Sequence, residues 1–234
     1  MATIAFDVYG TLIDTDGVVD RLREWIGSQA ETFSQTWRSK QLEYSFRRGL
    51  MRRYENFAVC TRHALDYCCA EYGVSFSEGQ KDALLQSYRA LPAFGDVQES
   101  LSGLKAQGHR LFAFSNGASE AVQEVLQANG LCKWFEGVVS CDTLKTFKPK
   151  PDVYHYFMKE AGDSNDAWLI SGNPFDVIGA VSAGMKSAWV KRSDRAVFDP
   201  WGVEPTVTVK SLNELCEKVD SQKKAANPNT TRFS

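Results

Sequence analysis

From residue 93 onward, short apolar segments alternate with helical ones, and this alternation constrains the fold more than any other feature of the sequence. Strands are expected at 110–114, 137–140, 168–170, 187–190 and 206–209. Helices are expected between and after them, at 96–107, 119–129, 151–161, 174–184 and 211–220. Strands that alternate with helices of this length form a parallel sheet with helices on both faces. The sequence therefore predicts a doubly wound α/β core with a Rossmann-like parallel sheet.

A long helical block separates the first strand of this core from the others. Residues 3–6 are apolar and precede a polar loop, as in a buried strand. The block contains helical stretches with almost no β-branched runs, at 18–26, 31–50, 57–72 and 77–88. We therefore expect a core formed by residues 1–14 and 93–220, with a helical cap inserted at 15–92. Residues 221–234 are polar and aperiodic, which predicts a disordered tail.

Charge and composition argue against several classes of protein. The 27 Lys and Arg residues nearly balance the 29 Asp and Glu residues, so we expect no nucleic-acid partner. No apolar run approaches the roughly 18 residues that cross a bilayer, and we expect no membrane partner. The six cysteines form no CxxC pair, and the absence of a basic leader favours a cytoplasmic protein. A dinucleotide-binding enzyme is disfavoured because no GxGxxG follows the first strand.

Polar residues follow four of the expected strands, at the ends where ligands bind in such sheets. In chain order these residues are Asp7 and Thr11, then Ser115 and Asn116, then Lys148, then Ser171, Asn173 and Asp176. Because the carboxyl ends of parallel strands meet at one edge of a sheet, we expect these side chains to converge. The three histidines lie outside these segments, which argues against a histidine-activated nucleophile and against a His-rich metal site.

Asp7 is the candidate nucleophile among these residues. An aspartate carboxylate is ionised at neutral pH, so it can attack carbon or phosphorus without a base to activate it. Lys148 is expected to keep Asp7 charged and oriented, and Asp176 to position a water or to pair with Lys148. Ser115 and Asn116 can donate hydrogen bonds to an anion. The alternatives are structural: helix caps or turns for the acids and for Ser115 and Asn116, and a surface position for Lys148.

These segments resemble the haloacid dehalogenase superfamily over about residues 3–220. Phosphatases of that superfamily typically carry D-x-D-x-T after the first strand and G-D after the fourth. This sequence has D-V-Y-G-T at 7–11 and Ser171 before Gly172, as in the type II L-2-haloacid dehalogenases. The segment W-R-S-K-Q-L-E-Y at 37–44 resembles a cap motif of those dehalogenases. This stretch is the most discriminating, because nothing about a parallel sheet requires it.

The resemblance implies hydrolysis of short L-2-haloalkanoic acids without a metal or cofactor. Asp7 is expected to attack C2 and expel halide with inversion, and water to hydrolyse the aspartyl ester and release a D-2-hydroxy acid. The implied catalytic residues are Asp7, Thr11, Arg38, Lys148, Ser171, Asn173 and Asp176. The implied substrate contacts are Tyr9, Arg38, Leu42, Phe57, Ser115, Asn116, Tyr154 and Phe175. The resemblance also implies a homodimer that associates through the helical cap.

The resemblance also implies the roles within these sets, and the chemistry of the side chains agrees with them. Arg38 and Asn116 are expected to cradle the departing halide against Phe57, and Ser115 to bind the substrate carboxylate. Asn173 and Asp176 are expected to orient the hydrolytic water. The alkyl group is expected to contact Tyr9, Leu42 and Phe175, and Tyr154 to brace Lys148.

Other functions remain open on the sequence alone. The same Asp7 route could act on another C2 electrophile, such as a fluoroacid or azetidine-2-carboxylate. A superfamily phosphatase and a non-catalytic scaffold are further alternatives. Ser39 and Phe175 stand where the dehalogenases often carry a larger polar residue and a tryptophan, so chain length and halide preference are not determined.

Overall fold

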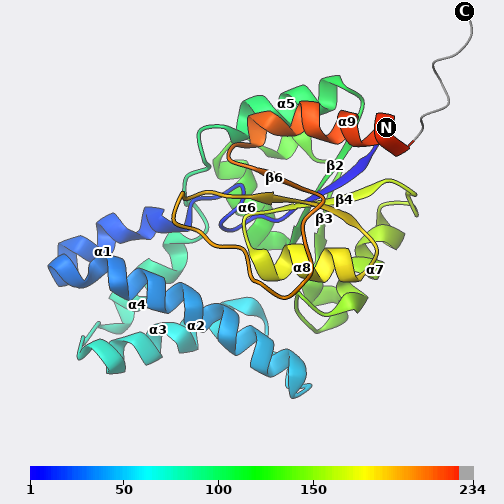
Figure 1. Cartoon of the computed structure of the whole chain (residues 1–234). Coiled ribbons are helices and arrows are strands. Elements are labelled where there is room, and N and C mark those ends of the chain that lie inside the picture. Colours follow the sequence, from blue (N-terminus) through cyan, green and yellow to red (C-terminus); the bar gives the residue numbers. More distant parts are fainter. Residues whose placement is uncertain (227–234) are drawn as a thin grey trace, which may run out of the picture.

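A computed structural model describes residues 1–226, whose strands form one parallel sheet (Figure 1). The strands are β1 Thr3–Phe6, β2 Arg110–Ser115, β3 Gly137–Ser140, β4 Ala167–Ser171, β5 Lys186–Val190 and β6 Val207–Val209. Within the described residues the strand order is β3-β2-β1-β4-β5-β6, and every neighbouring pair is parallel. The chain thus winds from β1 to one edge and then to the other, which confirms the predicted doubly wound α/β fold.

Helices cover both faces of the sheet. On one face lie α5 Val97–Ala106, α6 Ser119–Ala128 and α9 Leu215–Ala226, and on the other α7 Pro151–Glu160 and α8 Pro174–Ser182. Ile4 and Phe6 of β1 point into the first apolar layer, whereas Ala5 points into the second. Burial on both faces explains why the strands are almost continuous apolar runs. In the described part of the chain, no helix has the length and apolar character needed to cross a membrane.

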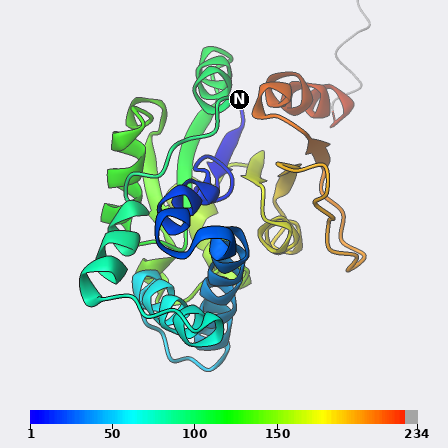
Figure 2. The ribbon, with the colours of Figure 1, turned by 90° about the vertical axis from the view of Figure 1, so that its left-hand side faces the viewer.

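The helices between β1 and α5 lie together, apart from the two layers that flank the sheet (Figures 1 and 2). They are α1 Val19–Ile26, α2 Ala30–Leu50, α3 Phe57–Tyr72 and α4 Glu78–Ser87. Buried Trp37 of α2 donates its indole N–H to the carbonyl of Thr61 in α3 at 2.9 Å. We propose that residues 15–92 act as a cap, and the term is used for this segment below.

The two connections to the cap are paired with each other. The Asp14 N–H donates to the Pro92 carbonyl at 2.8 Å, and the Phe94 N–H donates to the Leu12 carbonyl at 3.0 Å. The chain therefore leaves the sheet and returns to it at one place.

The prediction of a disordered tail from Ser221 is wrong at its start, because α9 continues to Ala226. Leu215 and Val219 anchor this helix in the core. The residues that follow include Gln222, Lys223 and Lys224, which are good helix formers although they carry no apolar periodicity. The rest of the predicted tail, residues 227–234, lies outside the described residues.

Candidate active site

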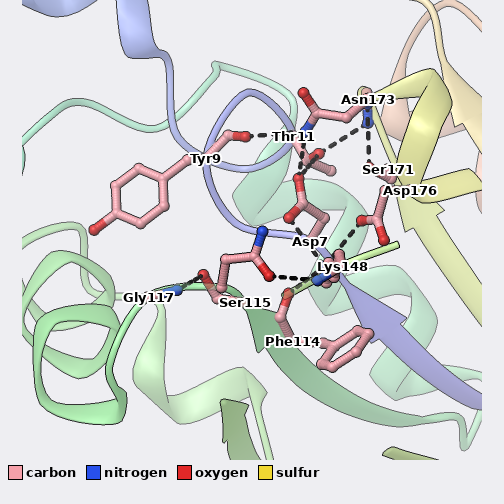
Figure 3. Close-up of polar contacts among 12 residues, drawn as sticks. Asp7, Tyr9, Thr11, Phe114, Ser115, Gly117, Lys148, Ser171, Asn173 and Asp176 are labelled. Carbon is pink, nitrogen blue, oxygen red and sulfur yellow. Dashed lines mark hydrogen bonds and ion pairs between the residues drawn. The ribbon is translucent and has the colours of Figure 1, made fainter. Parts of the chain in front are cut away.

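Asp7 follows β1 directly, and three side chains hold its carboxylate (Figure 3). The Thr11 hydroxyl and the Asn173 amide donate to Oδ2 at 2.7 and 2.8 Å. The Lys148 ammonium donates to Oδ1 at 3.2 Å. Because Oδ2 is engaged by two short hydrogen bonds and Oδ1 by one longer bond, Oδ1 is the oxygen better able to attack.

A tight loop after β1 brings Thr11 back to Asp7. Gly10 adopts a φ of +83°, a backbone conformation that favours glycine. The Thr11 hydroxyl also accepts the Gly172 N–H at 2.8 Å, which joins the loops after β1 and β4. A Cβ at Gly172 would lie 2.4 Å from the Gly10 carbonyl oxygen, so this close approach requires glycine.

Lys148 is buried between two carboxylates. Its ammonium lies 3.2 Å from Asp7 Oδ1 and 2.9 Å from Asp176 Oδ2, and it donates to the Phe114 carbonyl at 2.8 Å. Only 1% of the residue is exposed, which rules out the surface alternative. Burial by itself lowers the pKa of an ammonium, but the carboxylates of Asp176 and Asp7 outweigh it and hold the pKa of Lys148 above its ordinary value. The site therefore keeps a positive charge beside Asp7.

Asp176 and Tyr154 lie behind Lys148, and of the two roles predicted for Asp176 the structure shows the pairing with Lys148. The Tyr154 hydroxyl donates to Asp176 Oδ1 at 2.8 Å, so it contacts this carboxylate rather than Lys148 or a substrate. Asp176 is fully buried and is paired with Lys148, so it does not face a water at Asp7. The cause is that α7 and α8 pack side by side on one face of the sheet. This packing turns the side chains of Tyr154 and Asp176 inward.

Ser171 also lies outside the open part of the site. It is fully buried, and its hydroxyl accepts the Asn173 N–H at 3.1 Å. Ser171 thereby fixes the turn after β4 from which the Asn173 amide reaches Asp7.

A small cavity of about 20 Å³ opens onto Asp7 between the cap and the core. Its lining consists of Asp7, Tyr9, Arg38, Leu42, Phe57, Ser115, Asn116, Gly117, Lys148, Asn173 and Phe175. All of these except Gly117 are residues that the sequence singles out. The volume is about the room that one water occupies. In this structure the cap and the core therefore leave little room at Asp7.

The donors that face this cavity are fixed by their other contacts. Asn116 Oδ1 accepts the Lys148 N–H at 2.9 Å, which orients the amide and leaves its NH₂ group for the cavity. The Ser115 hydroxyl accepts the Gly117 N–H at 3.1 Å, which leaves its own proton to donate. The lining therefore offers hydrogen-bond donors to an anion.

Arg38 reaches the cavity from the cap. Its guanidinium donates to the Tyr9 carbonyl at 3.3 Å and to Gln41 Oε1 at 3.4 Å. Gln41 is fully buried and donates to the Tyr88 hydroxyl at 2.9 Å. Gln41 and Gly117 are not among the site residues predicted from the sequence. The spacing of Gln41, three residues after Arg38 on one helix, is the signal that would have found it.

Within residues 1–226, no group of three or more His, Cys, Asp or Glu side chains is arranged to hold a metal ion. The carboxylates of Asp7 and Asp176 share the Lys148 ammonium, so both already have a cationic partner.

Several known proteins are similar to this chain in sequence or in structure. The model of the haloacid dehalogenase-like hydrolases matches residues 1–184. Haloacetate dehalogenase H-2 of Moraxella sp. (strain B) is 36% identical over 91% of this chain and 95% of its own length. An (S)-2-haloacid dehalogenase of Pseudomonas sp. (strain YL) is 35% identical over 92% of each chain. The structure of L-2-haloacid dehalogenase from Xanthobacter autotrophicus with chloropropionic acid covalently bound matches with a TM-score of 0.85 and 30% identity, over 94% of this chain and 99% of that one.

Proposed function

The chain belongs to the haloacid dehalogenase-like hydrolase family, and we propose that it hydrolyses the carbon–halogen bond of L-2-haloacids with Asp7 as the nucleophile. The observation that carries the proposal is the Asp7 carboxylate at the cavity, with Lys148 behind it and Arg38 and Asn116 in the lining. The ammonium stabilises the charge of the attacking carboxylate, and the donors across the cavity can stabilise the halide anion that leaves. The (S)-2-haloacid dehalogenases among the relatives support the same reaction.

In the first half-reaction, Asp7 Oδ1 attacks C2 from the side opposite the halogen. The carbon–halogen bond breaks, its electron pair leaves with the halide, and C2 is inverted in the ester that forms. Arg38 and Asn116 stabilise the halide as it gains charge. Lys148 reduces the repulsion between Asp7 and the substrate carboxylate, which Ser115 binds.

In the second half-reaction, water attacks the ester carbonyl carbon of Asp7. The carbonyl oxygen is then Oδ2, which the Thr11 hydroxyl and the Asn173 amide hold at 2.7 and 2.8 Å. These two donors stabilise the negative charge that develops on Oδ2 in the tetrahedral intermediate. Cleavage of the bond to Oδ1 releases the D-2-hydroxy acid and a proton, and restores the Asp7 carboxylate.

The cap has a role in both steps. A cavity with room for about one water leaves little solvent beside Asp7, which strengthens the electrostatic interactions during displacement. Opening of the cap is then needed to admit the haloacid and to release the halide and hydroxy acid.

Halide release from L- and D-2-chloropropionate tests the proposal. We expect release from the L-enantiomer only, in the presence of EDTA, and a loss of at least about a thousandfold in Asp7→Asn because the amide is not nucleophilic. Asp14→Asn, outside the cavity lining, is the matched control and should keep the rate. Wild-type protein that releases no halide in EDTA, or Asp7→Asn protein that releases it at the wild-type rate, would refute the mechanism.

The quaternary structure and location are part of the same proposal. Leu50 and Met51, at the end of α2, are 86% and 60% exposed, and exposed apolar side chains grouped on one surface favour protein association. We propose a cytoplasmic homodimer that associates through this end of the cap. The cysteines are all free, which is usual in a reducing compartment.

A further inference from the structure

A second and larger cavity adjoins the one at Asp7. Its volume is about 440 Å³, against about 20 Å³ for the catalytic cavity. The two cavities share Tyr9, Arg38, Phe57 and Gly117 in their walls. Small-molecule sites commonly enclose roughly 300–1,000 Å³. The larger cavity therefore has the size of a ligand site and begins where the catalytic cavity ends.

The inner wall of the larger cavity is largely apolar. The cap contributes Ala58 and Leu85, and the core contributes Ala121 of α6. The rings of Tyr9 and Tyr88 lie 6.3 Å apart in the same wall. Burial raises the pKa of Tyr9 to about 12 and that of Tyr88 above its ordinary value, so both phenols stay neutral. A neutral wall of this kind favours hydrocarbon, because burying methylene groups stabilises a complex.

Charged groups lie at the rim of the cavity. Arg89, which follows α4 in the cap, donates to both carboxylate oxygens of Glu124 in α6, at 2.8 and 3.1 Å. The side chains of Arg89 and Glu124 are about half exposed, at 51% and 47%. The two charges compensate each other, so the mouth of the cavity gives little attraction to a second carboxylate on a ligand. An alkyl or aryl chain fits this environment better than a dicarboxylic acid.

We propose that the larger cavity binds the carbon chain of the substrate beyond C3, so that the protein accepts L-2-haloacids with long alkyl or arylalkyl chains. The proposal rests on the proposed function, because it needs C2 to lie at Asp7. Tyr9 connects the two parts: it borders both cavities, and Figure 3 shows its ring pointing away from Asp7. Ala121 determines chain length, because its small side chain leaves the cavity wall open at α6.

A series of L-2-bromoalkanoic acids from propanoate to octanoate tests this subsite. In the wild type, kcat/KM should rise about fourfold for each methylene that enters the cavity, the fold-change that corresponds to about 0.8 kcal/mol. In Ala121→Trp, the ratio of kcat/KM for octanoate to that for propanoate should fall at least about tenfold, because the indole fills the wall. Ala128→Trp, at an exposed position of the same helix, is the matched control and should leave both values unchanged.

The outcomes separate the two levels of the proposal. A wild-type kcat/KM that does not rise with chain length overturns the subsite, and so does an equal loss for both substrates in Ala121→Trp, which would make the cavity an entrance only. Failure of the wild type on 2-bromopropanoate would overturn the proposed function instead. Leu85→Trp, from the opposite wall, gives the same test if Ala121→Trp does not fold.

Discussion

Single residues in the site are organised around one buried ammonium. Lys148 joins Asp7 to Asp176, and Tyr154 extends the chain of contacts by donating to the far oxygen of Asp176. Removing any donor from a fully buried carboxylate costs the hydrogen bond and leaves an oxygen that water cannot reach. Tyr154 therefore acts on Asp7 only through Asp176 and Lys148, as a positioning residue.

Tyr154→Phe tests this chain of contacts. A hydrogen bond to a charged group contributes about 1.5–3 kcal/mol, so we expect the free energy of unfolding to fall by about 2 kcal/mol. We expect kcat to fall about tenfold with KM nearly unchanged, because the hydroxyl orients Asp176 and does not contact substrate. Steady-state kinetics and urea unfolding measure both effects. Tyr156→Phe, on the same helix, is the control, and a rise in KM at constant kcat in Tyr154→Phe would restore the direct substrate contact.

Among the elements, Arg192 after β5 links both connections of the cap to the core. It donates to the Thr11 carbonyl at 2.6 Å and to Asp96 Oδ2 at 2.7 Å, and its guanidinium stacks 4.1 Å from the Phe94 ring centroid. Asp96 Oδ2 also accepts the Ser211 hydroxyl at 2.9 Å. These contacts hold Thr11 in the place from which its hydroxyl reaches Asp7.

The pH dependence of the free energy of unfolding of Asp96→Asn tests this cluster. Burial raises the pKa of Asp96, but the hydrogen bonds from Arg192, the Leu212 backbone and Ser211 outweigh it and hold the pKa below its ordinary value. A lowered pKa in the folded state contributes stability above the unfolded value near 3.9, and that stability is lost as the pH falls toward the folded value. We expect Asp96→Asn to lower the free energy of unfolding by about 3 kcal/mol at pH 7.

Below about pH 4 the difference in the free energy of unfolding between Asp96→Asn and the wild type should become smaller. Urea unfolding at pH 7, 5, 4 and 3 measures it. Glu160→Gln, an exposed carboxylate on α7, is the control and should show no such convergence. A difference that stays constant down to pH 3 would mean that the charge of Asp96 does not stabilise the fold.

The parts of the fold and of the candidate site that could be predicted from the sequence are those encoded by neighbouring residues. Each strand lies within one residue of its predicted bounds, because a strand buried on both faces is an apolar run between polar turns. The residues around Asp7 could be found because they follow strands whose ends meet. The contact of Tyr154 with Asp176 depends on the packing of α7 on α8, which no local pattern encodes. Arg192 and Asp96 are 96 residues apart, and neither stands beside a motif.

For the whole molecule, the cap and the core meet through several side-chain contacts. The Tyr54 hydroxyl donates to Asp142, and Arg89 pairs with Glu124. The rings of Phe46 in α2 and Phe175 in α8 lie 5.0 Å apart. A half-exposed ion pair contributes at most about 1 kcal/mol, so the Arg89 contact adds little to the cost of opening the cap.

The proposed association through the cap also concerns the whole molecule. In the doubly substituted Leu50→Glu, Met51→Glu protein, two carboxylates would lose water at the proposed contact, so we expect the dimer dissociation constant to rise at least about a hundredfold. Sedimentation velocity over a range of concentrations measures it. Val197→Glu is the control, because this side chain is 79% exposed, lies on the core and does not line the cavity beside Leu50. Dissociation only in the control would move the interface to the core, and a monomeric wild type would exclude the homodimer.

The pairing of the two cap connections has a consequence for how such proteins diversify. Hydrogen bonds between residues 12–14 and 92–94 hold the ends of the cap segment side by side, so the sheet is insensitive to what lies between them. The entropy cost of closing a loop grows only slowly with its length, by about 0.6 kcal/mol for each doubling. Recombination can therefore exchange this segment for one of another size whose ends lie equally close. In this sense the proposed nucleophile, which follows β1, and the cap that lies over it can be inherited separately.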